Sequence, residues 1–224
     1  INTFLVVTMS YKPTMLVILD GFGHRQAKEG NAVLSAKMPF LQSLFAHHPT
    51  ALLNASGPAV GLLDGFIGNS EVGHLTLGAG RVIPSMLSRI HHAIDDDSLE
   101  KNPVLLQRFA QLKQSGASLH ILGLLSDGGV HSHEKHLYAL LRIAKKSGLT
   151  NVFIHPILDG RDVEPRSAAL YMQRLAAACT NAGIGTIASI QGRFYAMDRD
   201  KNWDRTQQSY NMLCGITSVP KETI

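Results

Sequence analysis

Short apolar runs alternate with longer amphipathic stretches along most of the chain. Each of four apolar runs ends in a polar, glycine-rich loop, as buried parallel strands do. These runs predict strands over residues 14–19, 118–125, 151–158 and 185–190. Between the later strands, two stretches place leucine and alanine at helical spacing and stop at a glycine, over residues 133–147 and 166–181. This order predicts an α/β fold built on a layered, mostly parallel sheet.

Charged or hydrogen-bonding residues follow each predicted strand. Ligands of open parallel sheets bind beyond the carboxyl ends of the strands, so this edge is where we expect a site. Further helices are predicted over residues 35–47, 84–94 and 103–115, and a domain boundary is predicted near residues 80–100.

Charge and cysteine usage narrow the classes of function. The 21 Lys and Arg are interleaved with 17 Asp and Glu, which predicts no nucleic-acid face but leaves room for a small anionic ligand. No apolar run approaches the roughly 20 residues of a membrane span, so no membrane association is predicted. Cys179 and Cys214 lie far apart, which fits a reducing compartment and predicts a cytoplasmic protein.

Asp20 directly follows the first apolar run. It either caps the next turn or serves as a hard oxygen ligand for Mg²⁺ or Mn²⁺. The glycines that follow it do not complete a dinucleotide-binding fingerprint, because Gln26 stands at the third glycine position.

A histidine-rich segment, HSHEKH, begins at His131. It is similar to binuclear metallohydrolase motifs, but Lys135 stands where those sites carry aspartate and would repel a metal. The alternative is that His133 and His136 face solvent on the first turn of a helix. His131 would then be the functional histidine of this segment.

Arginines stand at neighbouring strand ends. Arg161 follows the strand predicted over 151–158, and Arg193 and Arg199 lie beyond the next strand. Arginine binds phosphate and carboxylate in a bidentate way, so this set predicts a doubly anionic small molecule. The alternative is a group of surface ion pairs with nearby aspartates.

Ser70 lies in a glycine-rich loop, GNSEVG, between two apolar stretches. A serine becomes a nucleophile when a base or a metal lowers the cost of losing its proton. The segment has neither the GxSxG pattern of hydrolases nor the GK[ST] pattern of a phosphate-binding loop. Two interpretations remain open at this point: a helix N-cap, or a metal-activated hydroxyl at a loop-to-helix junction.

Five segments together are more specific than any one of them. They are LVILDGFGHR, GNSEVGHLTLGAGR, LLSDGGVHSHEKH, LDGRDVEPRSA and GRFYAMDRDKNWDR. Their order and spacing, over about residues 14–213, strongly resemble the cofactor-independent (2,3-bisphosphoglycerate-independent) phosphoglycerate mutases.

The resemblance implies a glycolytic isomerase that interconverts 3-phosphoglycerate and 2-phosphoglycerate through a phosphoserine. It implies two Mn²⁺ ions, with Mg²⁺ or another divalent ion as the alternative. Ser70 would be the nucleophile and, with Asp20, a metal ligand. Asp162 would move protons on and off the glycerate hydroxyls. The residues implied to bind the substrate are His131, Arg161, Asp162, Arg193 and Arg199.

The resemblance also implies how the chain is divided. Residues 1–11 would be an extension of unclear origin, since the first methionine is Met9. Residues 12–84 would be the first segment of an alkaline-phosphatase-like metal-binding domain. Residues 85–224 would be part of an inserted α/β phosphotransferase domain.

The chain also departs from the family pattern. The family's chain is longer, and its metal-binding domain resumes after the inserted domain to supply further Asp and His ligands. Because Asp20 and Ser70 are too few ligands for two metals, we expect the 224 residues alone to be inactive. Three hypotheses remain: the amino-terminal part of a working mutase that is monomeric when complete, a phosphoglycerate-binding remnant without catalysis, or another metal-dependent phosphohydrolase.

Overall fold

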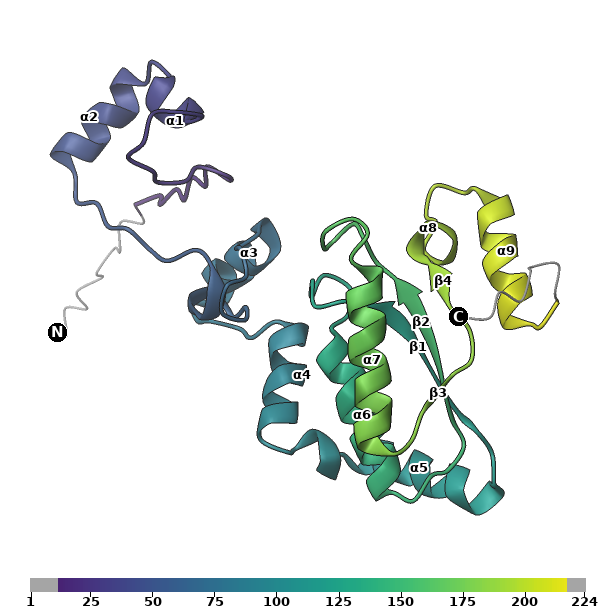
Figure 1. The fold of residues 1–224 in the computed structure, drawn as a ribbon. Coiled ribbons are helices and arrows are strands. Elements are labelled where there is room, and N and C mark those ends of the chain that lie inside the picture. Colours follow the sequence, from purple (N-terminus) through teal and green to yellow (C-terminus); the bar gives the residue numbers. More distant parts are fainter. Residues whose placement is uncertain (1–11, 217–224) are drawn as a thin grey trace, which may run out of the picture.

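The computed structural model describes residues 12–216, and the segment 1–11 predicted to be an extension lies outside them. Within this range the chain is an α/β protein with a four-stranded parallel sheet (Figure 1). The sheet is formed by β1 (Leu119–Leu125), β2 (Val152–Leu158), β3 (Thr186–Ile187) and β4 (Gln191–Gly192). The predicted fold class is therefore confirmed.

Helices connect and flank these strands. The main ones after residue 80 are α4 (Met86–Asp95), α5 (Pro103–Ser115), α6 (Glu134–Lys146), α7 (Ala168–Ala182), α8 (Arg193–Ala196) and α9 (Trp203–Leu213), with a 3-10 turn, η2 (Leu99–Lys101). Before residue 80 lie α1 (Ala32–Ser35), α2 (Pro39–His47), η1 (Gly57–Val60) and α3 (Ser70–Ala79). None of these helices is long and apolar enough to cross a bilayer.

The hydrophobic core lies between one face of the sheet and helices α5, α6 and α7. In Figure 1, α6 and α7 run side by side over the two long strands. Since successive strand residues point to opposite faces, Val152 and Ile154 enter the core while His155 points to the other side. Buried core residues include Phe109, Leu125, Leu141, Ile143, Ala144, Tyr171 and Leu175.

The prediction of a strand over residues 14–19 is wrong. The segment has no strand structure, and its side chains are exposed, with Met15 at 84% and Leu16 at 75%. A strand needs a neighbour for its backbone N–H and C=O groups and a face to bury its side chains. No strand among the described residues pairs with this segment, which explains why the apolar pattern alone does not produce one.

Other predicted elements are present with altered bounds. The strand predicted over 185–190 is reduced to β3, and β4 begins just after the predicted range; both pair with β2. The backbone between them still follows β2, since Ala188 N donates to Ile154 O at 2.9 Å. The helix predicted over 35–47 starts later than expected, as α2, with Pro39 as its first residue. Ser35, the first residue of the prediction, ends the short helix α1 instead.

Helix α4 packs against α6 through histidines. The ring of His91, which is 6% exposed, meets the rings of His133 and His136 at centroid distances of 4.6 and 5.0 Å. His136 Nε2 lies 3.2 Å from His91 Nδ1. The interpretation that His133 and His136 face solvent is therefore wrong, because α4 covers them.

Replacing Leu141 by alanine will destabilise the sheet and its helices. The side chain is fully buried in the core, so Leu141→Ala should lower the free energy of unfolding by about 2–5 kcal/mol. The matched control is Leu122→Ala, at a strand position that is 52% exposed, and it should cost less than about 1 kcal/mol. Urea unfolding followed by circular dichroism measures both, and equal losses would contradict the assigned core.

The histidine cluster makes stability depend on pH. Burial, with the neighbouring charges of His91 and His133, lowers the pKa of His136 from 6.5 to about 4. The unfolded chain then binds more protons than the folded one between these values, so the free energy of unfolding falls as the pH drops from 6.5 towards 4. His136→Gln should flatten this pH dependence in thermal melts. His92→Gln, at an exposed position on α4, should leave it unchanged, and equal slopes in all three proteins would count against the cluster.

Candidate anion pocket and serine site

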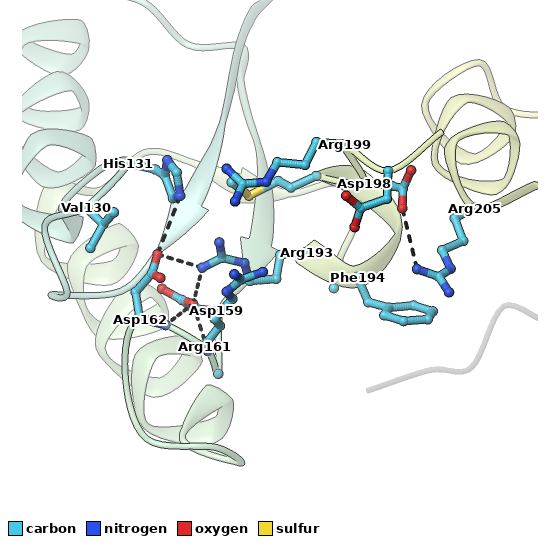
Figure 2. A pocket seen from close by; sticks show the side chains of 14 residues that line it. Val130, His131, Asp159, Arg161, Asp162, Arg193, Phe194, Asp198, Arg199 and Arg205 are labelled. Carbon is cyan, nitrogen blue, oxygen red and sulfur yellow. Dashed lines mark hydrogen bonds and ion pairs between the residues drawn. The ribbon is translucent and has the colours of Figure 1, made fainter. Parts of the chain in front are cut away.

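The loops that follow β1, β2 and β4 meet at one edge of the sheet. Because Leu125 is opposite Leu158 and Leu158 is opposite Gly192, the next residues on the three strands emerge together. A pocket of about 580 Å³ lies at this edge (Figure 2). Its lining includes His131, Asp159, Arg161, Asp162, Arg193 and Arg199. The structure thus brings together all the residues that the sequence predicted to bind a substrate.

The loop after β2 is shaped by its first residue. Asp159 Oδ1 accepts hydrogen bonds from the backbone N–H groups of Arg161 and Asp162, both at 3.1 Å. This is the turn that aspartate favours, with its side chain replacing a backbone acceptor. Gly160 has φ of +95°, a conformation that side chains disfavour. The turn directs Arg161 and Asp162 towards the pocket.

Arg193 lies between two carboxylates, as Figure 2 shows. Its Nη1 donates to Asp159 Oδ1 at 2.7 Å and to Asp162 Oδ2 at 2.6 Å. The Arg193 and Asp162 side chains are only 13% and 12% exposed. Burial by itself lowers the pKa of Arg193, but the two carboxylates outweigh it and raise that pKa. Arg193 is therefore a fixed cation at the base of the pocket.

The pKa of Asp159 is also set by burial and by hydrogen bonds acting in opposite directions. Burial alone raises the pKa of this carboxyl, but hydrogen bonds from Ser126, the backbone of Asp162 and Arg193 outweigh it and lower the pKa to about 2. Asp159 therefore stays ionised throughout the pH range in which proteins are normally studied.

Arg161 and Arg199 bring two further guanidinium groups to the pocket. Four arginines and four aspartates line the pocket, so its formal charges cancel when His131 is neutral. Asp159 and Asp162 are bound to Arg193, however, and Asp198 is paired with Arg205. Within residues 12–216 no carboxylate pairs with the side chains of Arg161 and Arg199, which are exposed. The surface ion pairs considered for Arg199 therefore do not form with the described residues.

His131 occupies one wall of the pocket beside Asp162. Its Nε2 lies 3.8 Å from Asp162 Oδ2, and its side chain is 42% exposed. Both side chains therefore border the same part of the cavity. His131 is the histidine of the HSHEKH segment that reaches the pocket.

The opposite wall was not predicted from the sequence. The Arg205 guanidinium lies 3.9 Å from the centroid of the Phe194 ring and pairs with Asp198. Asp198 also accepts hydrogen bonds from the backbone and side chain of Asn202. These contacts hold the segment that carries Arg199 against α9.

The second predicted site unites Ser70 with Asp20. Although fifty residues separate them, Ser70 Oγ donates a 2.7 Å hydrogen bond to Asp20 Oδ2. His74 Nδ1 lies 2.8 Å from the Ser70 carbonyl oxygen and 3.2 Å from Oγ. A carbonyl oxygen only accepts hydrogen bonds, so this nitrogen carries the proton and cannot remove one from Oγ. Asp20 is thus the group placed to accept the Ser70 proton.

Ser70 is not an N-cap, so that interpretation is wrong. Asn69 caps α3, and its side chain accepts from Val72 N at 3.1 Å. Ser70 is the first residue of the helix, which leaves its hydroxyl free for Asp20.

The donor atoms of the serine site fit part of a metal site. Carboxylate and hydroxyl oxygens suit Mg²⁺ and Mn²⁺. Across residues 12–216, however, no three His, Cys, Asp or Glu side chains converge in a way that would hold an ion. Asp20 and Ser70 would therefore supply two ligands of an incomplete set. The binuclear metal site considered for the histidine segment is likewise not formed by the described residues.

The two sites are separate. Neither Asp20 nor Ser70 lines the pocket, and Figure 1 shows α3 well away from the edge formed by β4 and α8. The arrangement combines a preformed anion pocket on the sheet with an oriented serine on a different part of the chain.

Asp159 and Ser126 were missed as members of the site. Ser126 Oγ donates to Asp159 Oδ2 at 2.7 Å, and the two side chains are almost completely buried. The available signal was their equal position, one residue beyond each of two paired strands.

Comparison with known proteins gives a consistent match. The family model for the amino-terminal part of BPG-independent PGAM matches residues 90–223. A 2,3-bisphosphoglycerate-independent phosphoglycerate mutase of Staphylococcus saprophyticus is 49% identical over 205 residues, which are 92% of this chain and 41% of that protein. Phosphoglycerate mutase 2 of this type from Methanosarcina acetivorans is 49% identical over 209 residues, 93% of this chain and 40% of that protein.

A solved structure agrees with these relatives. Leishmania mexicana phosphoglycerate mutase, crystallised at low cobalt concentration, superposes with a TM-score of 0.61 at 34% identity. The match covers 79% of this chain and 34% of that one. The chain thus spans about two fifths of the length of the curated relatives it matches.

Removing either free arginine should weaken anion binding. A charge-assisted hydrogen bond contributes about 1.5–3 kcal/mol, so Arg161→Ala and Arg199→Ala should each raise the Kd for inorganic phosphate by about tenfold or more. NMR titration with phosphate measures the change. Arg142→Ala, at an exposed position on α6 outside the pocket, is the control. Unchanged affinity in both pocket variants would exclude these residues as anion ligands.

Proposed function

The chain belongs to the 2,3-bisphosphoglycerate-independent phosphoglycerate mutase family, and on that premise we propose that it forms the amino-terminal part of such an enzyme. The proposed reaction interconverts 3-phosphoglycerate and 2-phosphoglycerate through a phosphoserine at Ser70. This reaction would place the protein in glycolysis. For the longer chain, our prediction remains a cytoplasmic and monomeric enzyme.

The observation that carries the proposal is the hydrogen bond from Ser70 Oγ to Asp20 Oδ2. Two motifs that lie fifty residues apart contribute a hydroxyl and a carboxylate to one point. Ser70 attacks phosphorus while its proton passes towards Asp20, and the bond between phosphorus and the glycerate oxygen breaks.

Asp20 and Ser70 also support the proposed use of a divalent ion, for which Mn²⁺ is our expectation and Mg²⁺ the alternative. Such an ion lowers the cost of deprotonating the hydroxyl and neutralises phosphoryl charge. Because the described residues supply only part of a ligand set, we propose that the 224 residues alone bind phosphoglycerate but do not turn it over.

The pocket is the proposed glycerate site. Arg161 and Arg199 are suited to the phosphoryl and carboxylate groups, since both have guanidinium groups free of carboxylate partners among the described residues. Asp162, fixed by Arg193, is the proposed proton carrier. It gives a proton to the glycerate oxygen that leaves phosphorus, and later accepts one from the hydroxyl that attacks the phosphoserine.

Turnover requires the serine and the pocket to approach each other, because in-line transfer needs the reacting atoms within about 3–3.5 Å. The separation of the two sites therefore implies that the part carrying α3 moves towards the pocket during the reaction. A phosphoserine left exposed to water would instead be hydrolysed, which is the behaviour of the phosphohydrolase alternative.

We test the proposal by joining this chain to the carboxy-terminal remainder of the Staphylococcus saprophyticus relative. With Mn²⁺, the chimera should convert 3-phosphoglycerate to 2-phosphoglycerate and form phosphoserine at Ser70, detected by mass spectrometry. Ser70→Ala should lower kcat at least about 10⁴-fold and abolish the modification, because no other group replaces the nucleophile.

Ser43→Ala is the matched control for this variant. Ser43 also lies on a helix with a histidine four residues later, His47, but the described residues give it no carboxylate partner. Its activity should equal that of the unaltered chimera. Mutase turnover that survives in Ser70→Ala would remove Ser70 from the mechanism, whereas phosphate release without 2-phosphoglycerate would favour a phosphohydrolase.

A further inference from the structure

Asp159 is the most enclosed charged side chain of the pocket. It directly follows β2, and its side chain is 1% exposed although the residue borders the cavity. A buried carboxylate is costly unless hydrogen bonds and opposite charge compensate it. The hydrogen-bond donors around Asp159 therefore have to compensate its buried charge.

Four hydrogen bonds from described residues reach this carboxylate. Oδ2 accepts from Ser126 Oγ at 2.7 Å, and Oδ1 accepts from Arg193 Nη1 at 2.7 Å. Oδ1 also accepts from the backbone N–H groups of Arg161 and Asp162. Oδ1 thus accepts three hydrogen bonds and Oδ2 one. With the side chain only 1% exposed, little of this carboxylate is accessible to a ligand.

The four donors come from three different strand ends. Ser126 follows β1, Arg161 and Asp162 belong to the loop after β2, and Arg193 follows β4. Three of these donors are themselves proposed substrate residues, and Asp159 joins them through one carboxylate. A change at Asp159 therefore alters the loop backbone and the Arg193 guanidinium together.

We propose that Asp159 is the positioning residue of the anion pocket: through Ser126, Arg193 and the backbone of its own loop it sets the affinity for phosphoglycerate without touching it. This inference rests on the proposed function for the identity of the ligand. The hydrogen bonds of Asp159, however, are formed without any ligand. Asp162, in contrast, reaches the pocket and has only Arg193 and the more distant His131 as charged side-chain partners among the described residues.

The variant Asp159→Asn tests whether Asp159 positions the pocket residues. The amide has nearly the same shape, but it lacks the charge and turns an NH₂ group towards either Ser126 or Arg193, both of which donate. We expect the Kd of the 224-residue chain for 3-phosphoglycerate, measured by NMR titration, to rise about tenfold or more. Inorganic phosphate is titrated in parallel as a second probe.

A double-mutant cycle with Arg193→Lys distinguishes positioning from general damage. If Asp159 acts through Arg193 and the loop it orders, the double variant should bind about as weakly as the weaker single variant. Losses that multiply would show that Asp159 acts independently of Arg193 and would overturn the part of the proposal that assigns its effect to this arginine. An Asp159→Asn variant that binds like the unaltered chain would overturn the whole proposal.

Asp127→Asn is the matched control. Asp127 is also a strand-end carboxylate bound by a hydroxyl and an arginine, Tyr171 and Arg174, but it does not line the pocket. It should leave both Kd values unchanged. An equal loss in this control would mean that any strand-end carboxylate has the same effect, which would overturn the specific role of Asp159.

Ser126→Ala keeps the proposal testable if Asp159→Asn does not fold. It removes a single hydrogen bond from Oδ2 and should raise the Kd by about threefold to tenfold; an unchanged Kd would then overturn the proposal. If the unaltered chain binds phosphate but not 3-phosphoglycerate, the proposed function fails while the phosphate titrations still decide the role of Asp159. Binding of neither probe overturns both.

Discussion

The parallel pairing of β1 with β2 is the constraint on which the rest of the pocket depends. The two strands are in register over seven residues, from Leu119 opposite Val152 to Leu125 opposite Leu158. Ser126 and Asp159 therefore emerge side by side, and β4 brings Arg193 to the same point. The core beneath the strands fixes this register, because a shift by one residue would move Val152 and Ile154 out of it.

Much of this arrangement was predictable from the sequence. The runs at 118–125 and 151–158 form strands. The arginines that follow β2 and β4 line one pocket, because parallel strands end at a common edge. The run at 14–19 has the same apolar pattern but no strand partner among the described residues, and pairing cannot be read from a run alone. The four hydrogen bonds that Asp159 accepts come from three loops, so spacing did not distinguish it from Asp162.

The described residues form the pocket more fully than they form the serine site. The anion pocket is preformed, since Arg193 is held by two carboxylates while Arg161 and Arg199 have no carboxylate partner among the described residues. The serine site has an oriented hydroxyl, but among residues 12–216 only Asp20 and Ser70 would be ligands for the expected metal. Binding without turnover is the behaviour that this division predicts for the 224 residues.

A crystal structure of the chain with 3-phosphoglycerate tests the central claim most directly. The account predicts a ligand whose anionic groups contact Arg161 and Arg199, with Asp159 still bound to Ser126 and Arg193 and not touching the ligand. A ligand bound away from the strand ends, or one that replaces Arg193 on Asp159, would contradict the claim that the sheet edge carries a preformed anion site.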